Sequence, residues 1–360
     1  LDDRQIDANI IETGCLGFCS AEPLLDVQLP GKNRISFKFM TEDKVYSVLD
    51  GLFNNVIFTE DTLGQYTSRL YEAFDSVPFM DDLPFFALQK KLVSDLSGKI
   101  SPSSIEEYIA HGGYKAYLKT IRYYTSVEIC NVIEKSRLKG RGGGGFLTGE
   151  KWKLALNTGA SQKYLICNAD ESDPGAYSHR ALIESNPHRL IEGICIAAYA
   201  IGSSRAFIYV RSSYDKAIHL LARAIDQAHE YGLLGHNVFE SGFNLEIVLK
   251  RGAGALVCGE ETALISSIEG KRGMPRPKPP YPAESGLFGK PTVVNNVETL
   301  MNVPAIIANG PDWYSSIGTE LTSGTKVLSL SGKIVRNGLV EVAMGTSLKK
   351  VIEKIGRAHV

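Results

Sequence analysis

Short apolar runs alternate with amphipathic stretches through the middle of the chain. Residues 164–167, 205–211 and 244–251 carry the β-branched and aromatic side chains typical of strands. Between and beside them, residues 187–201 and 214–231 place apolar side chains at helical spacing. Strand and helix in alternation predict an α/β domain with a largely parallel sheet.

Weaker patterns on both sides of this region predict further elements. A Ser-capped helix is expected to end before Gly112, and a second, smaller α+β domain is expected from residue 325 onward. The other expected elements are strands at 24–29, 35–40, 326–334 and 338–344, and helices at 43–53, 126–138 and 347–355.

Residues 140–145, GRGGGG, form the most unusual stretch. Five glycines in six positions cost much chain entropy, so such a loop indicates that the backbone passes very close to another group. Bare N–H groups flanked by Arg141 and Lys151 suit a phosphate. A flexible linker is the alternative, but linkers are usually polar, whereas Phe146 and Trp152 follow closely.

This glycine loop also matches the G-x-G-x-x-G pattern of dinucleotide-binding folds. That fingerprint requires a strand before the loop. Here the expected helix at 126–138 precedes it. The sequence therefore disfavours a plain Rossmann dehydrogenase while leaving a phosphate-binding loop in place.

Polar side chains gather at the carboxyl end of the expected strand 164–167. Ligands of open α/β sheets bind at that edge of the strands. A surface turn has a similar composition and remains the alternative. The side chains concerned are Asn168, Asp170, Glu171, Ser172 and Asp173.

Two more polar groups lie at expected helix starts. Glu260 and Glu261 follow a second glycine-rich segment; the helix dipole alone explains one carboxylate there more easily than two. Asn295 and Asn296 can cap a helix or bind a ligand. Between them, the proline-rich residues 272–292 are expected to be extended, either as a wall of a site or as a docking segment.

Cys15 and Cys19 are the only two of the six cysteines that are close together in the sequence. Their C-x3-C spacing can supply half the ligands of an iron–sulfur cluster. Two unconnected thiols or a small disulfide are the alternatives. The other four cysteines stand singly in apolar surroundings, which predicts reduced, buried thiols.

Composition excludes several classes of function. The 360 residues carry a formal net charge of -1, without the basic excess of a nucleic-acid-binding surface. Neither a membrane-spanning run nor a signal peptide is evident, so a cytoplasmic protein without direct membrane insertion is expected. The chain begins at Leu1 and ends in IGRAHV, which resembles a translated sequencing adapter; we expect a fragment.

Four ordered blocks carry a family resemblance: GRGGGGFLTGEKW, CNADESDPGAY, GAGALVCGEETAL and KPPYPAESGLFGKPTVVNNVETL. Together they resemble the flavin-carrying, NADH-oxidising subunit of respiratory complex I and its relatives. The upstream GCLGFCSAEP is similar to a cysteine pair of a thioredoxin-like [2Fe–2S] domain. Such a domain is fused to the flavoprotein mainly in diaphorase subunits of NAD(P)-linked hydrogenases and formate dehydrogenases.

The resemblance implies a Rossmann-like FMN-binding domain with a mostly parallel sheet, followed by a small β-grasp domain. A partial thioredoxin-like domain would precede them. The implied bounds are 1–30 for the end of the [2Fe–2S] domain, 31–84 for a connecting segment, 85–310 for the FMN/NADH domain, 320–355 for a partial β-grasp domain, and 355–360 for a non-native tail.

It also implies roles for individual residues. Cys15 and Cys19 would be half of a [2Fe–2S] site, and the catalytic chemistry would belong to FMN. The implied FMN contacts are Gly140, Arg141, Gly142, Gly143, Lys151, Asn168, Asp170, Glu171, Ser172, Gly259, Glu260, Glu261, Asn295, Asn296 and Thr299. The implied NADH contacts are Phe146, Asp173, Glu261, Lys278 and Tyr281.

The implied activity is hydride transfer between NAD(P)H and FMN, with single electrons passing to iron–sulfur clusters of partner subunits. A [4Fe–4S] cluster is expected in a C-terminal part beyond this sequence. One alternative is a non-catalytic docking subunit that keeps the fold. Another is an ordinary dehydrogenase, which the absence of a strand-first fingerprint disfavours.

Overall fold

The computed structural model describes residues 6–54, 56–57, 60–173 and 175–358, and it divides the chain into two compact units. The first contains Lys91–Val327, Ala343–Gly345 and the described residues up to Leu16; the second contains Gly17–Lys90, Leu328–Val342 and the segment from Thr346. The predicted N-terminal domain and C-terminal tail include residues 1–5 and 359–360, which lie outside the described residues. No described helix combines the length and apolar character needed to cross a bilayer.

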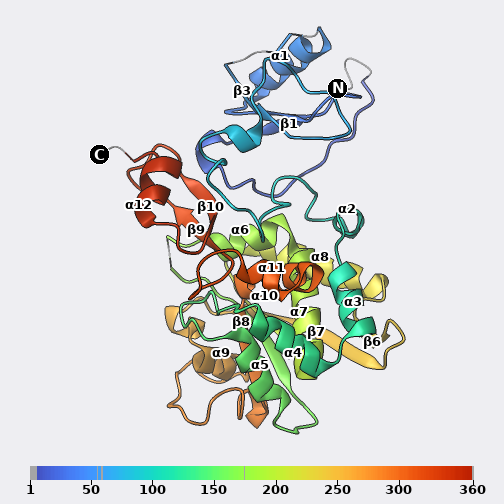
Figure 1. Ribbon diagram of the computed structural model, residues 1–360, viewed down its shortest axis with the longest axis vertical. Coiled ribbons are helices and arrows are strands. Elements are labelled where there is room, and N and C mark those ends of the chain that lie inside the picture. The colour runs from blue at the N-terminus through green and yellow to red at the C-terminus, as the bar shows by residue number, and fades with distance from the viewer. Residues whose placement is uncertain (1–5, 55, 58–59, 174, 359–360) are drawn as a thin grey trace. The chain divides into compact units, whose positions relative to one another are not determined.

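A five-stranded sheet forms the centre of the first unit, in the order β6-β7-β5-β4-β8. Figure 1 labels three of its strands, β6, β7 and β8. Neighbouring strands pair in parallel except β6, which pairs antiparallel with β7 at one edge. The predicted mostly parallel sheet is thus confirmed. The strands are β4 Tyr164–Ala169, β5 Arg205–Arg211, β6 Gly235–Val238, β7 Phe243–Gly252 and β8 Thr292–Asn296.

Helices cover both faces of this sheet. Against one face, α9 (Glu261–Ile268) packs Leu264 and Ile265 onto Ile166 and Val294 of neighbouring strands. Against the other lie three helices, of which α7 packs against both of the others: α7 Pro187–Ile201, α8 Asp215–Glu230 and α10 Val297–Asn309. This is the three-layer arrangement expected when a parallel sheet buries both faces.

The strand order places a topological switch between β4 and β8. After β4 the chain continues to β5 on one side, whereas β8 pairs with the opposite edge of β4. Ligands of open α/β sheets bind outside the carboxyl ends of the strands at such a point. Both polar segments predicted to bind a ligand, residues 168–173 and Asn295–Asn296, lie at these strand ends.

Short helices complete the first unit. The predicted serine cap is confirmed: the Ser104 hydroxyl accepts a hydrogen bond from the Glu107 backbone N–H at 3.1 Å. Four of the helices, α3, α5, α6 and α11, are additional to the predicted elements. The set is α2 Ile105–Ala110, α3 Lys115–Tyr123, α4 Ser126–Lys135, α5 Thr148–Leu156, α6 Ser178–Ser185 and α11 Pro311–Ser315.

Gly149 explains how α4 and α5 can flank the glycine loop so closely. A Cβ at this position would lie 2.3 Å from the backbone nitrogen of Glu134, closer than any real side chain could approach. Glycine therefore lets the first turn of α5 touch the last turns of α4. Figure 1 shows the two green helices side by side, with α5 next to β8.

The second unit has its own small sheet and core. β1 (Leu25–Val27), β2 (Ile35–Phe37) and β3 (Thr62–Gln65) form an antiparallel sheet, on which α1 (Glu42–Phe53) packs Val48 and Leu52. The predicted [2Fe–2S] domain ends at residue 30, and this sheet includes one strand before that residue and two after it. The predicted domain boundaries stay predictions.

The C-terminal strands confirm the predicted pair. β9 (Thr325–Leu330) begins in the first unit and pairs with β10 (Gly338–Ala343). The predicted final helix is α12 (Leu348–Lys350), followed by a π-helical turn, Val351–Ile355.

His188 belongs to a buried polar network between helices. Its Nε2–H donates to the Gln227 side-chain carbonyl at 3.0 Å, because the Gln227 amide nitrogen is directed to the Ser103 carbonyl. Its Nδ1 therefore accepts from the Tyr114 hydroxyl at 2.9 Å. Burial lowers the pKa of His188 to about 4, so the folded protein keeps the ring neutral.

We expect His188 to make the protein acid-sensitive. Between its lowered pKa and the ordinary value of 6.5, the unfolded chain binds a proton that the folded chain does not, so stability falls as pH falls. The parent should lose about 2 kcal/mol of unfolding free energy between pH 7 and 5 that a His188→Gln variant keeps. Urea unfolding of both proteins at the two pH values measures this difference, and equal losses would contradict it.

Candidate functional site

The glycine loop is a closed turn between α4 and α5. The Gly140 N–H donates to the Phe146 carbonyl at 2.9 Å, and the Thr148 N–H donates to the Leu138 carbonyl at 2.8 Å. Gly143 and Gly145 have φ values of 104° and 61°, which favour glycine. A Cβ on Gly143, Gly144 or Gly145 would meet nothing within 4 Å, so the loop borders open space.

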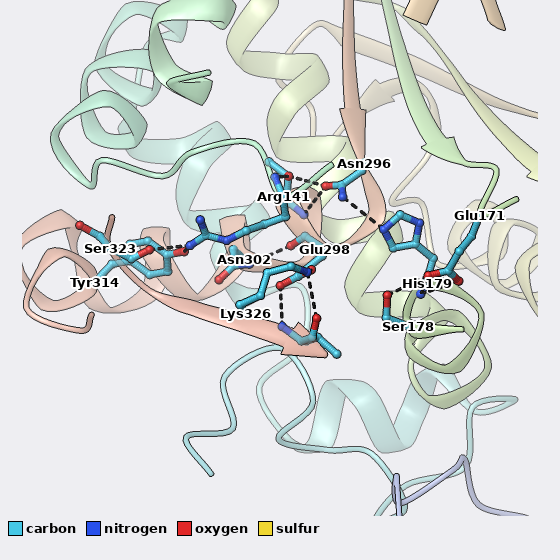
Figure 2. Close-up of polar contacts among 12 residues, drawn as sticks. Arg141, Glu171, Ser178, His179, Asn296, Glu298, Asn302, Tyr314, Ser323 and Lys326 are labelled. Atoms are coloured by element: carbon cyan, nitrogen blue, oxygen red, sulfur yellow. Dashed lines mark hydrogen bonds and ion pairs between the residues drawn. The ribbon is translucent and has the colours of Figure 1, made fainter. Parts of the chain in front are cut away.

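Arg141 is tied to the C-terminal part of this unit. Its backbone N–H donates to the Thr299 hydroxyl at 2.9 Å, and its guanidinium donates to the Tyr314 hydroxyl at 3.2 Å and to the Ser323 carbonyl. Figure 2 shows the guanidinium extending toward Tyr314 and Ser323. The sequence suggests Arg141 as a cation beside a phosphate, whereas in the structure its guanidinium is hydrogen-bonded to Tyr314 and Ser323.

The segment after β4 contains a buried carboxylate that has no hydrogen-bond partner among the described residues. Asp170 is only 7% exposed, and neither carboxylate oxygen has a hydrogen-bond partner among the described residues. Burial raises the pKa of Asp170, although the nearby Ser172 hydroxyl and Arg211 act in the opposite direction. The Ser172 Oγ is also buried and has no hydrogen-bond partner among the described residues. Such groups are rare unless a ligand or water satisfies them.

The neighbouring residues of this segment have structural tasks. The Asn168 amide donates to the Gly259 carbonyl at 2.9 Å and accepts from the Asp170 backbone N–H at 3.2 Å. The Glu171 carboxylate accepts from the Ser178 hydroxyl at 2.8 Å and from the His179 backbone N–H at 3.0 Å. Glu171 therefore caps the start of α6, a role that its spacing from that helix did not suggest.

Two lysines and two glutamates form an ion-pair cluster at the start of α9. The Lys151 ammonium lies 2.9 Å from Glu261, and Lys278 lies 2.5 Å from Glu261 and 3.3 Å from Glu260. Burial alone would raise the pKa of Glu261, but the two lysines outweigh it and lower that pKa. Lys278 belongs to the proline-rich segment 272–292, so this segment contributes a side chain to the ion-pair cluster. Such a position is consistent with the expected wall of a site.

Glu260 is the N-cap of α9 rather than part of its first turn. Its carboxylate accepts from the backbone N–H groups of Thr262 at 2.8 Å and Ala263 at 3.0 Å. The helix dipole and these two donors explain why Glu260 is a carboxylate. The Glu261 carboxylate, by contrast, pairs with Lys151 and Lys278.

The paired asparagines end β8 with different partners. Asn295 accepts a hydrogen bond from the Trp152 indole N–H at 2.8 Å, which fixes α5 against the strand. Asn296 caps α10, as predicted, by accepting from the Thr299 backbone N–H at 2.9 Å. Lys151 also reaches this strand, donating to the Val294 carbonyl at 3.0 Å.

The remaining predicted residues differ in how exposed they are. Phe146 and Tyr281 are 53% and 56% exposed, so their rings are accessible for stacking. Asp173 is exposed and accepts from the Gly175 N–H at 3.0 Å. Cys15 and Cys19 are half-buried, and the described part of the chain holds no cluster of three or more His, Cys, Asp or Glu side chains suited to a metal ion. The other four cysteines are buried, as predicted.

Sequence reasoning missed several residues that build this site. It gave no role to His179, whose Nε2 contacts the Asn296 amide at 3.2 Å (Figure 2). It also gave no role to Glu298, which is fully buried and paired with Lys326. No local signal marks these residues, because their partners are distant in the sequence.

Comparison with known proteins identifies the domain around this site. Residues 133–305 match the Complex1_51K family, described as the Nuo51 FMN-binding domain. This stretch of the chain is thus similar to the Nuo51 FMN-binding domain. The match includes the glycine loop, the segment after β4, the start of α9 and the paired asparagines of β8.

The curated relatives of this chain include proteins named as subunits of a hydrogenase and of an NADH-quinone oxidoreductase. It is 54% identical to the NADP-reducing hydrogenase subunit HndC of Solidesulfovibrio fructosivorans, over 74% of the chain and 54% of that protein. It is 52% identical to an NADH-quinone oxidoreductase subunit of Aquifex aeolicus, over 70% of the chain and 58% of that protein. The chain thus spans little more than half the length of these relatives.

A solved structure agrees with this assignment. The crystal structure of an NAD+-reducing [NiFe]-hydrogenase in the H2-reduced state matches 95% of the chain and 53% of the hydrogenase chain, with 29% identity and a TM-score of 0.64. The candidate site provides open glycine backbone, lysine charge and a buried carboxylate that has no hydrogen-bond partner among the described residues. Those features suit a ligand that carries both a phosphate and hydroxyl groups.

Proposed function

We propose that this chain binds FMN and transfers hydride from NAD(P)H to it, as the electron-entry module of a multisubunit oxidoreductase. The observation that carries the proposal is the buried carboxylate of Asp170, which follows β4 and has no hydrogen-bond partner among the described residues; the glycine loop is open in the same domain. A carboxylate can accept hydrogen bonds from the ribityl hydroxyls of FMN, and the loop amides with Lys151 suit its phosphate. The match to the Nuo51 family supports the same cofactor.

The proposed FMN shell joins the loop to the strand ends. We place in it the glycines and the backbone of Arg141, the carboxyl ends of β4 and β8, and the start of α9. Its members are Gly140, Arg141, Gly142, Gly143, Lys151, Asn168, Asp170, Glu171, Ser172, Gly259, Glu260, Glu261, Asn295, Asn296 and Thr299.

The chain's own residues then organise the reaction. FMN, when bound, accepts a hydride as two electrons and releases them singly. The exposed rings of Phe146 and Tyr281 offer stacking surfaces for the nicotinamide cofactor, and Lys278 offers charge beside Glu261. Asp173 would face the nicotinamide ribose. Because no protein acid or base is needed for hydride transfer, the protein acts by orienting the two cofactors.

The partners follow from the same proposal. We place iron–sulfur subunits next in the electron path, since the relatives are named as subunits of hydrogenase and quinone-oxidoreductase complexes. Cys15 and Cys19 would supply half of a [2Fe–2S] site within a thioredoxin-like domain, and residues 320–355 would be part of a β-grasp domain. We assign the chain to the cytoplasm or to the cytoplasmic side of a membrane complex.

Reconstitution with FMN tests the proposal. The full chain should take up FMN and turn yellow, and NADH or NADPH should bleach the flavin absorbance under anaerobic conditions. A one-electron acceptor should then restore the colour. A chain that takes up no FMN, or whose bound FMN neither nucleotide reduces, contradicts the proposal and leaves a non-catalytic docking subunit.

Two matched variants separate the two binding roles. Lys151→Met should weaken FMN binding by about tenfold or more, since it removes a charged hydrogen-bond donor. Lys278→Met removes the other lysine from the same glutamate and should leave FMN affinity unchanged while raising the KM for NADH. Fluorescence titration and steady-state kinetics measure the two effects.

A further inference from the structure

A chain of side-chain hydrogen bonds runs from α6 to the glycine loop. The His179 Nε2 lies 3.2 Å from the Asn296 amide nitrogen, and the Asn296 carbonyl oxygen contacts the Thr299 hydroxyl. The Thr299 hydroxyl in turn contacts the backbone nitrogen of Arg141 at 2.9 Å. Figure 2 shows Asn296 between Arg141 and His179.

The direction of every bond in this chain is determined. A backbone N–H can only donate, so the Thr299 hydroxyl accepts from Arg141 and gives its own proton to Asn296. The Thr299 backbone N–H donates to the same Asn296 oxygen at 2.9 Å. An Asn296 amide turned the other way would place its NH2 group against a backbone donor. The NH2 group must therefore face His179.

His179 can accept that hydrogen bond only in one neutral form. Its Nε2 must carry no proton, which leaves the proton on Nδ1. The Nδ1 is shielded from solvent and has no partner among the described residues. Burial lowers the pKa of the ring and Lys326 does so too, while Glu171 acts in the opposite direction, so the neutral form is retained.

We propose that His179 is a positioning residue for the glycine loop: its neutral ring fixes the Asn296 amide, and Asn296 and Thr299 fix the backbone at Arg141. The amides of the adjacent glycines are then held where FMN needs them. This inference rests on the proposed function. Without an acceptor at the Nε2 position, Asn296 has a buried, unsatisfied donor and loses its fixed orientation.

Two amide substitutions test the position of the acceptor. The side-chain oxygen of His179→Gln can reach the place of Nε2, whereas that of His179→Asn stops near the place of Nδ1. Both variants are neutral and polar, and both remove the ring. We expect the Kd for FMN to rise roughly tenfold in His179→Asn and to stay within about threefold of the parent in His179→Gln.

Thermal unfolding of the FMN-free proteins distinguishes positioning from folding. The two variants should unfold at similar temperatures. Equal FMN affinity in both variants, whether retained or lost, would overturn the role of His179. A parent chain that fails to bind FMN would instead refute the proposed function, on which this role depends.

The tautomer can be measured without any cofactor. Long-range 1H–15N correlation spectra of the FMN-free chain report which ring nitrogen carries the proton, and the His179 signals are those absent from His179→Gln. We expect the proton on Nδ1 at neutral pH. A proton on Nε2 would overturn the proposal, whatever the outcome for FMN binding.

Discussion

Replacing Asp170 with alanine should stabilise the cofactor-free protein and at the same time weaken FMN binding. The parent buries this carboxylate without a hydrogen-bond partner among the described residues, and removing an unpaired buried charge should raise the unfolding free energy by about 1–2 kcal/mol. The same carboxylate is the proposed acceptor for FMN hydroxyls. Its loss should raise the Kd for FMN roughly 10–100-fold.

The stability gain should depend on pH in a defined direction. Burial raises the pKa of Asp170 above its ordinary value, so between the two values the folded chain binds a proton that the unfolded chain has released. The parent therefore loses stability as pH rises through this range, and the advantage of Asp170→Ala should grow with pH. Urea unfolding of the FMN-free parent and variant, from acidic to neutral pH, measures the difference between their unfolding free energies.

Asp173 provides a matched control within the same segment. It is exposed, and its carboxylate accepts from the Gly175 N–H. Asp173→Ala should leave both the stability and the FMN affinity nearly unchanged, within about 0.5 kcal/mol. If Asp170→Ala destabilises the cofactor-free chain, or binds FMN as tightly as the parent, the assignment of Asp170 to the cofactor is wrong.

Lys326→Met should cause the largest loss of stability among single substitutions near the site. Glu298 is fully buried, its carboxylate pairs with Lys326, and it also accepts from the Val327 backbone N–H at 2.8 Å. Removing the lysine leaves a buried charge without its counter-charge. The unfolding free energy should fall by about 3–5 kcal/mol.

A double-mutant cycle isolates the ion pair. In a Glu298→Gln background the same Lys326→Met change should cost much less, because no buried charge remains. Unfolding in urea measures all four proteins. Similar losses in both backgrounds would show that packing of the lysine stem, rather than charge, accounts for the effect.

The sequence alone determined the features that depend on neighbouring residues. The alternation of strands and helices, the Ser104 cap and the Asn296 cap follow from side chains within a few positions of one another, and the structure contains all three. The helix before the glycine loop was predicted correctly in the same way. The ordered motifs also identified the family, which a match over residues 133–305 supports.

Only the tertiary structure decided which side chains meet. His179 and Asn296 are 117 positions apart, and Arg141 and Tyr314 are 173 apart. The first contact depends on the pairing of β8 beside β4, and the second on the packing of α11 against α4; both bring late residues next to early ones. No local spacing encodes that pairing, so the sequence could name the glycine loop but not the residues that hold it.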